Sequence, residues 1–200
     1  MKLKYIIGIL ALFLLMVGTA SAETFLLTNA NEPYFQGKIQ IQVNVDEANG
    51  KISVQYLSDD VPETPLGIDT FYYNLDGSDT GLYRISNVME GSTDATAAWN
   101  KNFDGTTADG FGKFLSRQSL NSGGDGGISD PIVFTLFNSF TGIDPNTYGH
   151  RVAIHIRFSD DKSTWVTDGN GSEIPEFPSI ALPVAAVIGI MFIVGSRKKE

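Results

Sequence analysis

Histidine and cysteine are the side chains most readily tuned for catalysis near neutral pH, and this chain of 200 residues has two histidines and no cysteine. His150 follows a predicted turn, and His155 alternates with Ala153 and Arg157 along a predicted strand. Both patterns are typical of surface or hydrogen-bonded histidines rather than of a general base. The lack of cysteine and of an H-E-x-x-H motif excludes thiol hydrolases and zincin-type metalloproteases, and the sequence contains no G-x-S-x-G nucleophile elbow.

Paired carboxylates are the remaining route to an enzyme, because a glycosidase needs two of them about 5 to 10 Å apart across a cleft. The adjacent pairs Asp59-Asp60 and Asp160-Asp161 have the right chemistry, but neighbouring residues near a strand end point in different directions. A glycoside hydrolase is therefore the least favoured function. We expect no catalytic residues and no enzymatic activity.

Aspartates in glycine-rich turns offer the hard oxygen ligands that calcium prefers. The candidates are Asp76, Asp79, Asp104, Asp109, Asp160, Asp161 and Asp168. None of them follows the D-x-[DN]-x-[DN]-G spacing of an EF-hand loop. Aspartate and glycine also form turns without a metal, so we predict no metal site and no cofactor, and a calcium-binding module stays an alternative.

Exposed aromatic side chains would be needed to bind a carbohydrate. The available tyrosines and tryptophans are Tyr72, Tyr73, Tyr83, Trp99, Tyr148 and Trp165. We expect most of them in the core, because aromatic residues dominate the energetics of protein interiors. A carbohydrate-binding module is the second alternative. Asn170-Gly171-Ser172 is the single N-glycosylation sequon and falls in a predicted linker.

Period-two alternation of apolar and polar residues recurs along the chain and predicts strands rather than helices. Residues 38–45 and 51–57 alternate on both sides of Asn49-Gly50, which predicts a hairpin. Residues 92–100 could form one short helix, capped by Ser92 or Thr93. Further strands are expected over residues 67–75, 81–88, 110–118, 130–138 and 150–158. The pattern predicts an all-β, antiparallel β-sandwich of jelly-roll or immunoglobulin-like type over residues 23–168.

The N-terminal segment has the three parts of a secretory signal peptide. Lys2 and Lys4 precede an apolar stretch of about 13 residues, which is shorter than the roughly 20 that span a bilayer. Ala20 and Ala22 then supply the small residues that signal peptidase requires. We predict that residues 1–22 are removed and that Glu23 becomes the mature N-terminus.

The C-terminal segment has the plan of a membrane anchor. Residues 179–195 are apolar, and 17 helical residues would cover about 26 Å of a hydrocarbon core near 30 Å thick. Positive residues beside a span stay on the cytoplasmic side, so the short tail of residues 196–200 predicts an anchored protein whose domain lies outside. The residues of this stop-transfer signal are Arg197, Lys198 and Lys199.

The order Pro175-Glu176-Phe177, apolar segment, basic end resembles the PEF-CTERM sorting signal of archaeal surface proteins. The resemblance covers roughly the last 26 residues, with the motif in a predicted linker over residues 169–178. It implies that an archaeosortase, a membrane-embedded transpeptidase, cuts near the motif and moves the protein to another attachment. Residues 109–166 are more loosely similar to the middle domains of other proteins with such tails, which supports a β-sandwich and implies no chemistry.

Net charge limits the partners. Between Glu23 and Phe177 the chain has 9 Lys and Arg against 22 Asp and Glu, a net charge of −13. Such a surface repels nucleic acid. We therefore expect a non-enzymatic, membrane-anchored cell-surface protein with a structural or adhesive role, whose partners are signal peptidase, an archaeosortase and polymers of the envelope or extracellular matrix.

Overall fold

The computed structural model describes residues 22–59, 61, 63–75, 85–102, 106–120, 128–137, 140 and 142–173. These residues form strands and one short 3-10 helix, so the prediction of an all-β antiparallel fold is confirmed. In chain order the elements are β1 (Ala22–Ala30), β2 (Ile41–Asp46), β3 (Lys51–Tyr56), β4 (Pro65–Tyr73), β5 (Ile85–Glu90), β6 (Thr93–Asp94), η1 (Thr96–Ala98), β7 (Trp99–Asn102), β8 (Thr106–Ala108), β9 (Gly112–Phe114), β10 (Ser116–Leu120), β11 (Ile132–Leu136), β12 (Val152–Phe158) and β13 (Ser163–Glu173).

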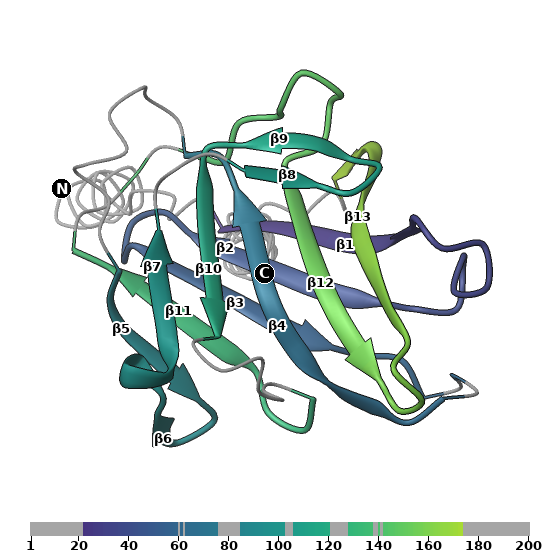
Figure 1. Ribbon diagram of the computed structural model, residues 1–200. Helices are drawn as coiled ribbons and strands as arrows, with labels where there is room; N and C mark the ends of the chain where they lie inside the picture. The colour runs from purple at the N-terminus through teal and green to yellow at the C-terminus, as the bar shows by residue number, and fades with distance from the viewer. Residues whose placement is uncertain are drawn as a thin grey trace, which may run out of the picture. The chain divides into compact units, whose positions relative to one another are not determined.

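One 11-stranded antiparallel sheet contains all of these strands except the small β8–β9 hairpin. Its order is β6-β5-β11-β3-β2-β1-β13-β12-β4-β10-β7. The sheet curls so that a front layer, β13-β12-β4-β10-β7, crosses a back layer, β5-β11-β3-β2-β1 (Figure 1). The pairing of β1 with β13 joins the two layers into one hydrogen-bonded sheet, whereas a jelly-roll or immunoglobulin-like sandwich has two separate sheets.

The β2–β3 hairpin follows the alternation of its sequence. Val45 pairs with Ile52 and Asp46 with Lys51, and the apolar residues of both strands are buried. In the connecting turn Gly50 has φ of 61°, a backbone conformation that favours glycine. The Asp46 side chain accepts hydrogen bonds from the backbone and side-chain nitrogens of Asn49. The predicted hairpin is confirmed.

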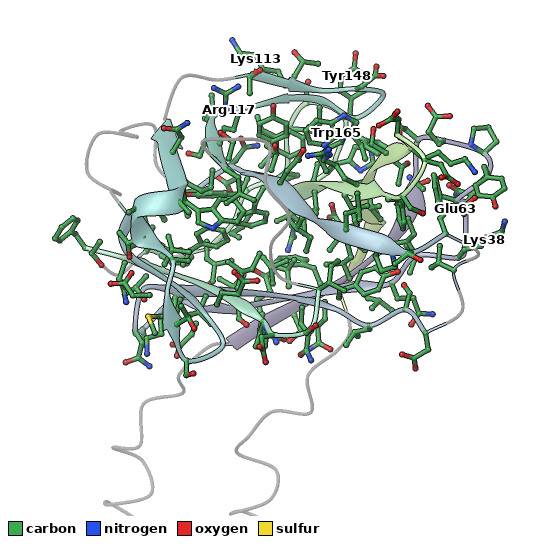
Figure 2. All side chains as sticks on the ribbon, turned by 60° about the horizontal axis from the view of Figure 1, so that its bottom comes forward. Lys38, Glu63, Lys113, Arg117, Tyr148 and Trp165 are labelled. Atoms are coloured by element: carbon green, nitrogen blue, oxygen red, sulfur yellow. The ribbon has the colours of Figure 1, made fainter. Side chains whose placement is uncertain are left out.

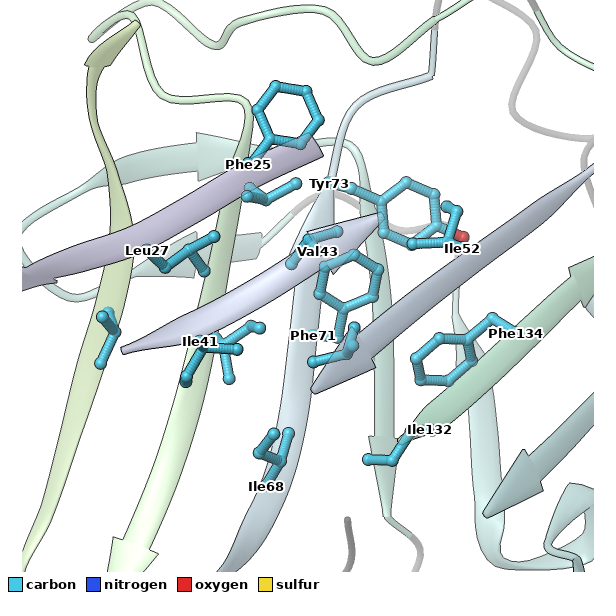
Figure 3. Packing of buried hydrophobic residues seen from close by; sticks show 14 of the residues in the cluster. Phe25, Leu27, Ile41, Val43, Ile52, Ile68, Phe71, Tyr73, Ile132 and Phe134 are labelled. Atoms are coloured by element: carbon cyan, nitrogen blue, oxygen red, sulfur yellow. The ribbon is translucent and has the colours of Figure 1, made fainter. Parts of the chain in front are cut away.

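The core lies between the two layers and is rich in aromatic rings. Phe71 of β4 stacks on Tyr73 at 5.0 Å and on Phe134 of β11 at 5.5 Å between ring centroids. Trp99 of β7 meets the same Phe134 edge to face at 5.1 Å. Figure 3 shows Phe71, Tyr73 and Phe134 among aliphatic side chains from both layers. Packing across the layers therefore fixes the curl of the sheet.

The helix predicted over residues 92–100 is wrong in length and in capping. The structure has one 3-10 turn, Thr96–Ala98, between the short strands β6 and β7, and neither predicted cap is used. The Asp94 carboxylate accepts a hydrogen bond from the backbone N–H of Thr96 instead. Trp99 is buried between the layers, so tertiary packing returns the chain to a strand after one turn.

The strand predicted over residues 110–118 is divided into β9 and β10. The chain changes direction at Leu115, whose backbone N–H donates to the side-chain oxygen of the buried Asn74 at 2.7 Å. Phe114 packs against the outside of the front layer, whereas Ser116 faces the interior. Of the strand predicted over residues 81–88, the structure describes only residues 85–88.

The two strands at the seam between the layers were not predicted. Strand β1 covers residues just after the expected signal cleavage site, and β13 continues to Glu173, through residues 169–173 that were expected in a linker. Phe25 pairs with Glu173 and Leu27 with Asp168, so two steps along β1 correspond to five along β13 and the ladder bulges between these pairs. Backbone pairing with β1 thus keeps a glycine-rich segment in the sheet.

Several predicted segments lie outside the described residues. They are the signal peptide of residues 1–22, except its last residue, the sorting motif of Pro175, Glu176 and Phe177, the anchor of residues 179–195, and the basic tail of residues 196–200. Within the described part of the chain, no helix is long and apolar enough to cross a membrane.

Candidate functional site

One line of residues crosses the outer surface of the front layer, and strand register defines it. His155 of β12 pairs with Trp165 of β13 on one side and with Thr70 of β4 on the other. Ser119 of β10 pairs with Thr70 and with Asn100 of β7. Directly paired residues point to the same face of a sheet, so these five residues, which we call the outer row, lie side by side away from the core.

The outer row carries an aromatic residue and a histidine bonded to a carboxylate at one end. The His155 ring lies 4.7 Å from the Trp165 ring, between centroids. Its Nδ1 lies 2.7 Å from the carboxylate of Asp69, and the two side chains are 21% and 16% exposed. The carboxylate fixes the orientation of the imidazole. His155 is thus hydrogen-bonded within the sheet surface.

A second aromatic group, which we call the outer cluster, packs beside the outer row. Trp165 stacks on Tyr72 at 4.9 Å and an interplanar angle of 9°, and Tyr72 stacks on Phe114 at 5.9 Å and 8°. The rings meet above Ala153, a buried residue that pairs directly with Tyr72. The β8–β9 hairpin covers this cluster, adding Phe111. The cluster therefore holds Trp165 in a fixed position at the end of the outer row.

Basic residues flank the outer row. Arg117 of β10 pairs with Tyr72 and lies two residues before Ser119, and Arg157 of β12 pairs with Ser163 and lies two residues after His155. Figure 2 shows Arg117, Trp165 and the exposed Lys113 along the same side of the molecule. The front face thus carries two arginines and a lysine around the outer row, in a domain that is acidic as a whole.

Asp168 is a buried carboxylate at the seam, 1% exposed. Burial raises its pKa, against the opposing effects of hydrogen bonds from the Thr167 hydroxyl and the backbone N–H groups of Arg151 and Val152. His150 is also buried, and its Nδ1 lies 3.1 Å from the backbone oxygen of Asp168. Together these groups fix the start of β12 on β13. Both histidines are hydrogen-bonded, as expected.

The loop before β12 holds the β8–β9 hairpin on the front layer. Asn146 donates a hydrogen bond to the backbone oxygen of Phe111, and its side-chain oxygen accepts from the backbone N–H groups of Tyr148 and His150. The Tyr148 ring, 67% exposed, packs directly over Gly112, where a Cβ would lie 2.0 Å from the ring. A side chain at Gly112 would therefore displace this tyrosine.

An ion pair lies beside the β12–β13 turn. Lys162 pairs with Glu63, and its ammonium lies 4.8 Å from the centroid of the Tyr34 ring. Burial alone would raise the pKa of Glu63, but hydrogen bonds from Lys162 and Tyr34 outweigh it and lower the pKa. The Glu63 contact in turn raises the pKa of Lys162. The arrangement binds three segments of the chain together, a structural role.

The calcium candidates do not converge in the described part of the chain. Asp109 is an exposed turn residue, and Asp160 and Asp161 form the β12–β13 turn with φ of 64° and 55°. Asp168 lies five residues into β13, with its carboxylate already bonded to backbone amides. Among described residues no group of three or more acidic or histidine side chains is placed to hold a metal. The remaining candidates, Asp76, Asp79 and Asp104, lie outside the described residues.

The aromatic candidates divide between the interior and the front face. Tyr73 and Trp99 are in the core, Tyr72 is buried in the outer cluster, Trp165 is half-buried and Tyr148 is exposed. Tyr83 and the side chain of Asn170 lie outside the described residues, and the sequon falls in the bulge of β13. The aromatic candidates at the front face are thus Tyr72, Tyr148 and Trp165.

Sequence reasoning missed Asp69, Thr70, Ser119 and Asn100. Nothing in a single strand marks these common polar residues, because their grouping depends on which strands become neighbours. The signal that could have found them is the outward position of each in an alternating strand. Alternation alone does not find Asp69, because the β4–β12 register shifts between the pairs His155–Thr70 and Ile156–Ile68.

Fold and surface together define an all-β protein with one polar and aromatic sheet face. The model of the PEF-CTERM archaeal protein sorting domain matches residues 174–198, so the chain carries this sorting domain. Such a domain implies a membrane-associated cell-surface protein that an archaeosortase processes at its C-terminal end. No curated protein and no solved structure matches the chain.

Proposed function

We propose that this protein is displayed outside the cell, where its β domain has a structural or adhesive role and catalyses no reaction. The sorting domain at residues 174–198 is the observation that carries the proposal. The curled sheet supports a sandwich-like domain that folds around its own core, and the acidic surface suits a soluble exterior module. The signal peptide, cleaved before Glu23, and the span of residues 179–195 are parts of the same proposal.

The polar groups at the described surface support a non-enzymatic role, because none of them forms a catalytic arrangement with its described neighbours. The His155–Asp69 pair has a tryptophan beside it and no serine among the contacts that the described residues make with it. The carboxylate of Asp168, buried at the seam, is bonded to backbone amides. We therefore assign no catalytic residue and no cofactor, with calcium as the alternative ligand.

A carbohydrate-binding module is the second candidate function. The outer row favours it, because a fixed aromatic ring next to hydroxyl and amide side chains is the usual composition of a sugar-binding surface. This candidate is compatible with the first, since an adhesive protein needs a surface that binds an envelope or matrix polymer.

Intact-mass spectrometry of the protein from its native membrane tests the proposal. We expect a chain that begins at Glu23, ends near Phe177 and carries the added mass of a lipid, with a glycan mass if Asn170 is modified. A mass that retains residues 1–22 and the basic tail, in protein recovered from the cytosol, would overturn it.

A further inference from the structure

We propose that the outer row binds an acidic polysaccharide, one whose sugar units carry carboxylate groups. The inference rests on the proposed adhesive role and names the surface and the ligand class. Its basis is the coincidence, on one sheet face, of an aromatic ring, a line of hydrogen-bonding side chains and flanking guanidinium groups.

The outer row has the shape of a linear polymer site. Its five residues come from five adjacent strands, β13, β12, β4, β10 and β7. With neighbouring strands about 4.8 Å apart, the row extends for about 19 Å. A saccharide chain lying perpendicular to the strands would meet one side chain of the row at each strand.

The side chains of the row suit sugar rings. Trp165 offers a ring whose orientation is fixed by Tyr72, 4.9 Å away, and the C–H face of a pyranose packs on such a ring. Thr70 and Ser119 are half-buried and Asn100 is exposed, so their polar atoms can exchange hydrogen bonds with sugar hydroxyls. Sugar hydroxyls both donate and accept, as these side chains do.

The charge of the face selects an acidic polymer. Arg117 lies on one side of the row and Arg157 on the other, with Lys113 in the hairpin beyond Arg117. Of the acidic residues on this side, Asp69 already pairs with His155, and Asp109 is exposed in the β8–β9 turn. A guanidinium group can bind a carboxylate through two parallel hydrogen bonds.

The back layer provides an internal comparison. Its outer surface has an equivalent row, in which Thr24, Asn44 and Ser53 pair in register. There the polar groups bond one another: the Thr24 hydroxyl and the Gln42 amide both donate to the side-chain oxygen of Asn44. The back row has no aromatic residue, so it is the matched control for the front face.

Affinity electrophoresis of the full chain in non-ionic detergent tests the inference, with polygalacturonate as the acidic polymer and dextran as the neutral one. We expect polygalacturonate to retard the protein at low salt and dextran to leave its migration unchanged. Arg117→Gln should weaken binding about tenfold, since it removes a charge-assisted bidentate contact. Lys51→Gln, on the back layer, removes the same charge and should leave binding unchanged.

Tryptophan fluorescence gives an independent readout. Polygalacturonate should change the emission of the wild type, and Trp165→Phe should abolish most of that change while the buried Trp99 remains. Failure of polygalacturonate to bind, or equal losses in Arg117→Gln and Lys51→Gln, would overturn the inference. Either result would leave the processed mass of the mature protein unaffected, so the inference can fail while the proposed surface display stands.

Discussion

The two outer faces of the curled sheet arise from the same alternation of residues but differ in what they present. On the back layer, the outward residues of β2 and β3 are glutamine, asparagine, aspartate, serine and lysine, and the Gln42 amide donates to the side chain of Asn44. On the front layer, the outward residues of β4, β10, β12 and β13 include Tyr72, Arg117, His155 and Trp165. Alternation therefore decides which side chains face outward, and their identity decides what a face can bind.

The two faces share one core, and breaking that core gives the largest expected effect. Phe71→Ala removes a fully buried ring that stacks on Tyr73 and Phe134. We expect the free energy of unfolding to fall by about 3–5 kcal/mol. Urea denaturation followed by circular dichroism and by tryptophan fluorescence measures it. Transitions that separate between the two probes would contradict a single core that supports both faces.

The sequence predicted most of the strands but not which strands pair with one another in the sheet. The β2–β3 hairpin and the inward face of β12 follow from local alternation and one glycine turn. The seam was missed, because residues 22–30 adjoin the expected signal peptide and residues 169–173 have the composition of a linker. The outer row was missed for a similar reason: Thr70 and Ser119 become neighbours through pairing across 49 residues, which local sequence does not encode.

The second prediction sharpens the comparison between the faces. Trp165→Ala removes stacking on Tyr72 and should lower the free energy of unfolding by about 2 kcal/mol. Val133→Ala on the outer side of β11 is the matched change on the back layer and should cost less than about 1 kcal/mol. Denaturant titration of both variants compares them. Equal losses would show that the front face is no more tightly packed than the back.

The third prediction concerns Asp168, at the seam where the layers join. Burial raises its pKa in the folded state, so its ionisation opposes folding, and wild-type stability should fall as pH rises from about 3.9 through the raised pKa. Asp168→Asn has no charge to bury, so its stability should not fall over this pH range. Below that range its free energy of unfolding should be about 1 kcal/mol lower than that of the wild type, because the amide makes weaker hydrogen bonds. Thermal unfolding of both proteins across this pH range measures the difference. If the wild type instead became more stable relative to the variant as pH rises, the predicted direction of the effect would be wrong.

The fourth prediction, with the smallest effect, concerns the ion pair beside the β12–β13 turn. The pKa of Glu63 is lowered, so its ion pair with Lys162 stabilises the fold above the ordinary carboxyl pKa and is lost as pH falls through the lowered value. Glu63→Gln should therefore reduce stability slightly near neutral pH and have no effect in acid. Melting temperatures at several pH values test it, and a difference that persists in acid would assign the loss to packing.

The bulge between Phe25–Glu173 and Leu27–Asp168 has a mechanical consequence for a protein held by its C-terminal end. Tension on the tail would first peel residues 169–173 away from β1, where the ladder is irregular and resists little. Peeling would then reach Asp168, whose carboxylate is bonded to the backbone of Arg151 and Val152. The C-terminal end of β13 can thus detach and extend under load, while the hydrogen bonds of the buried carboxylate hold the rest of the sheet together.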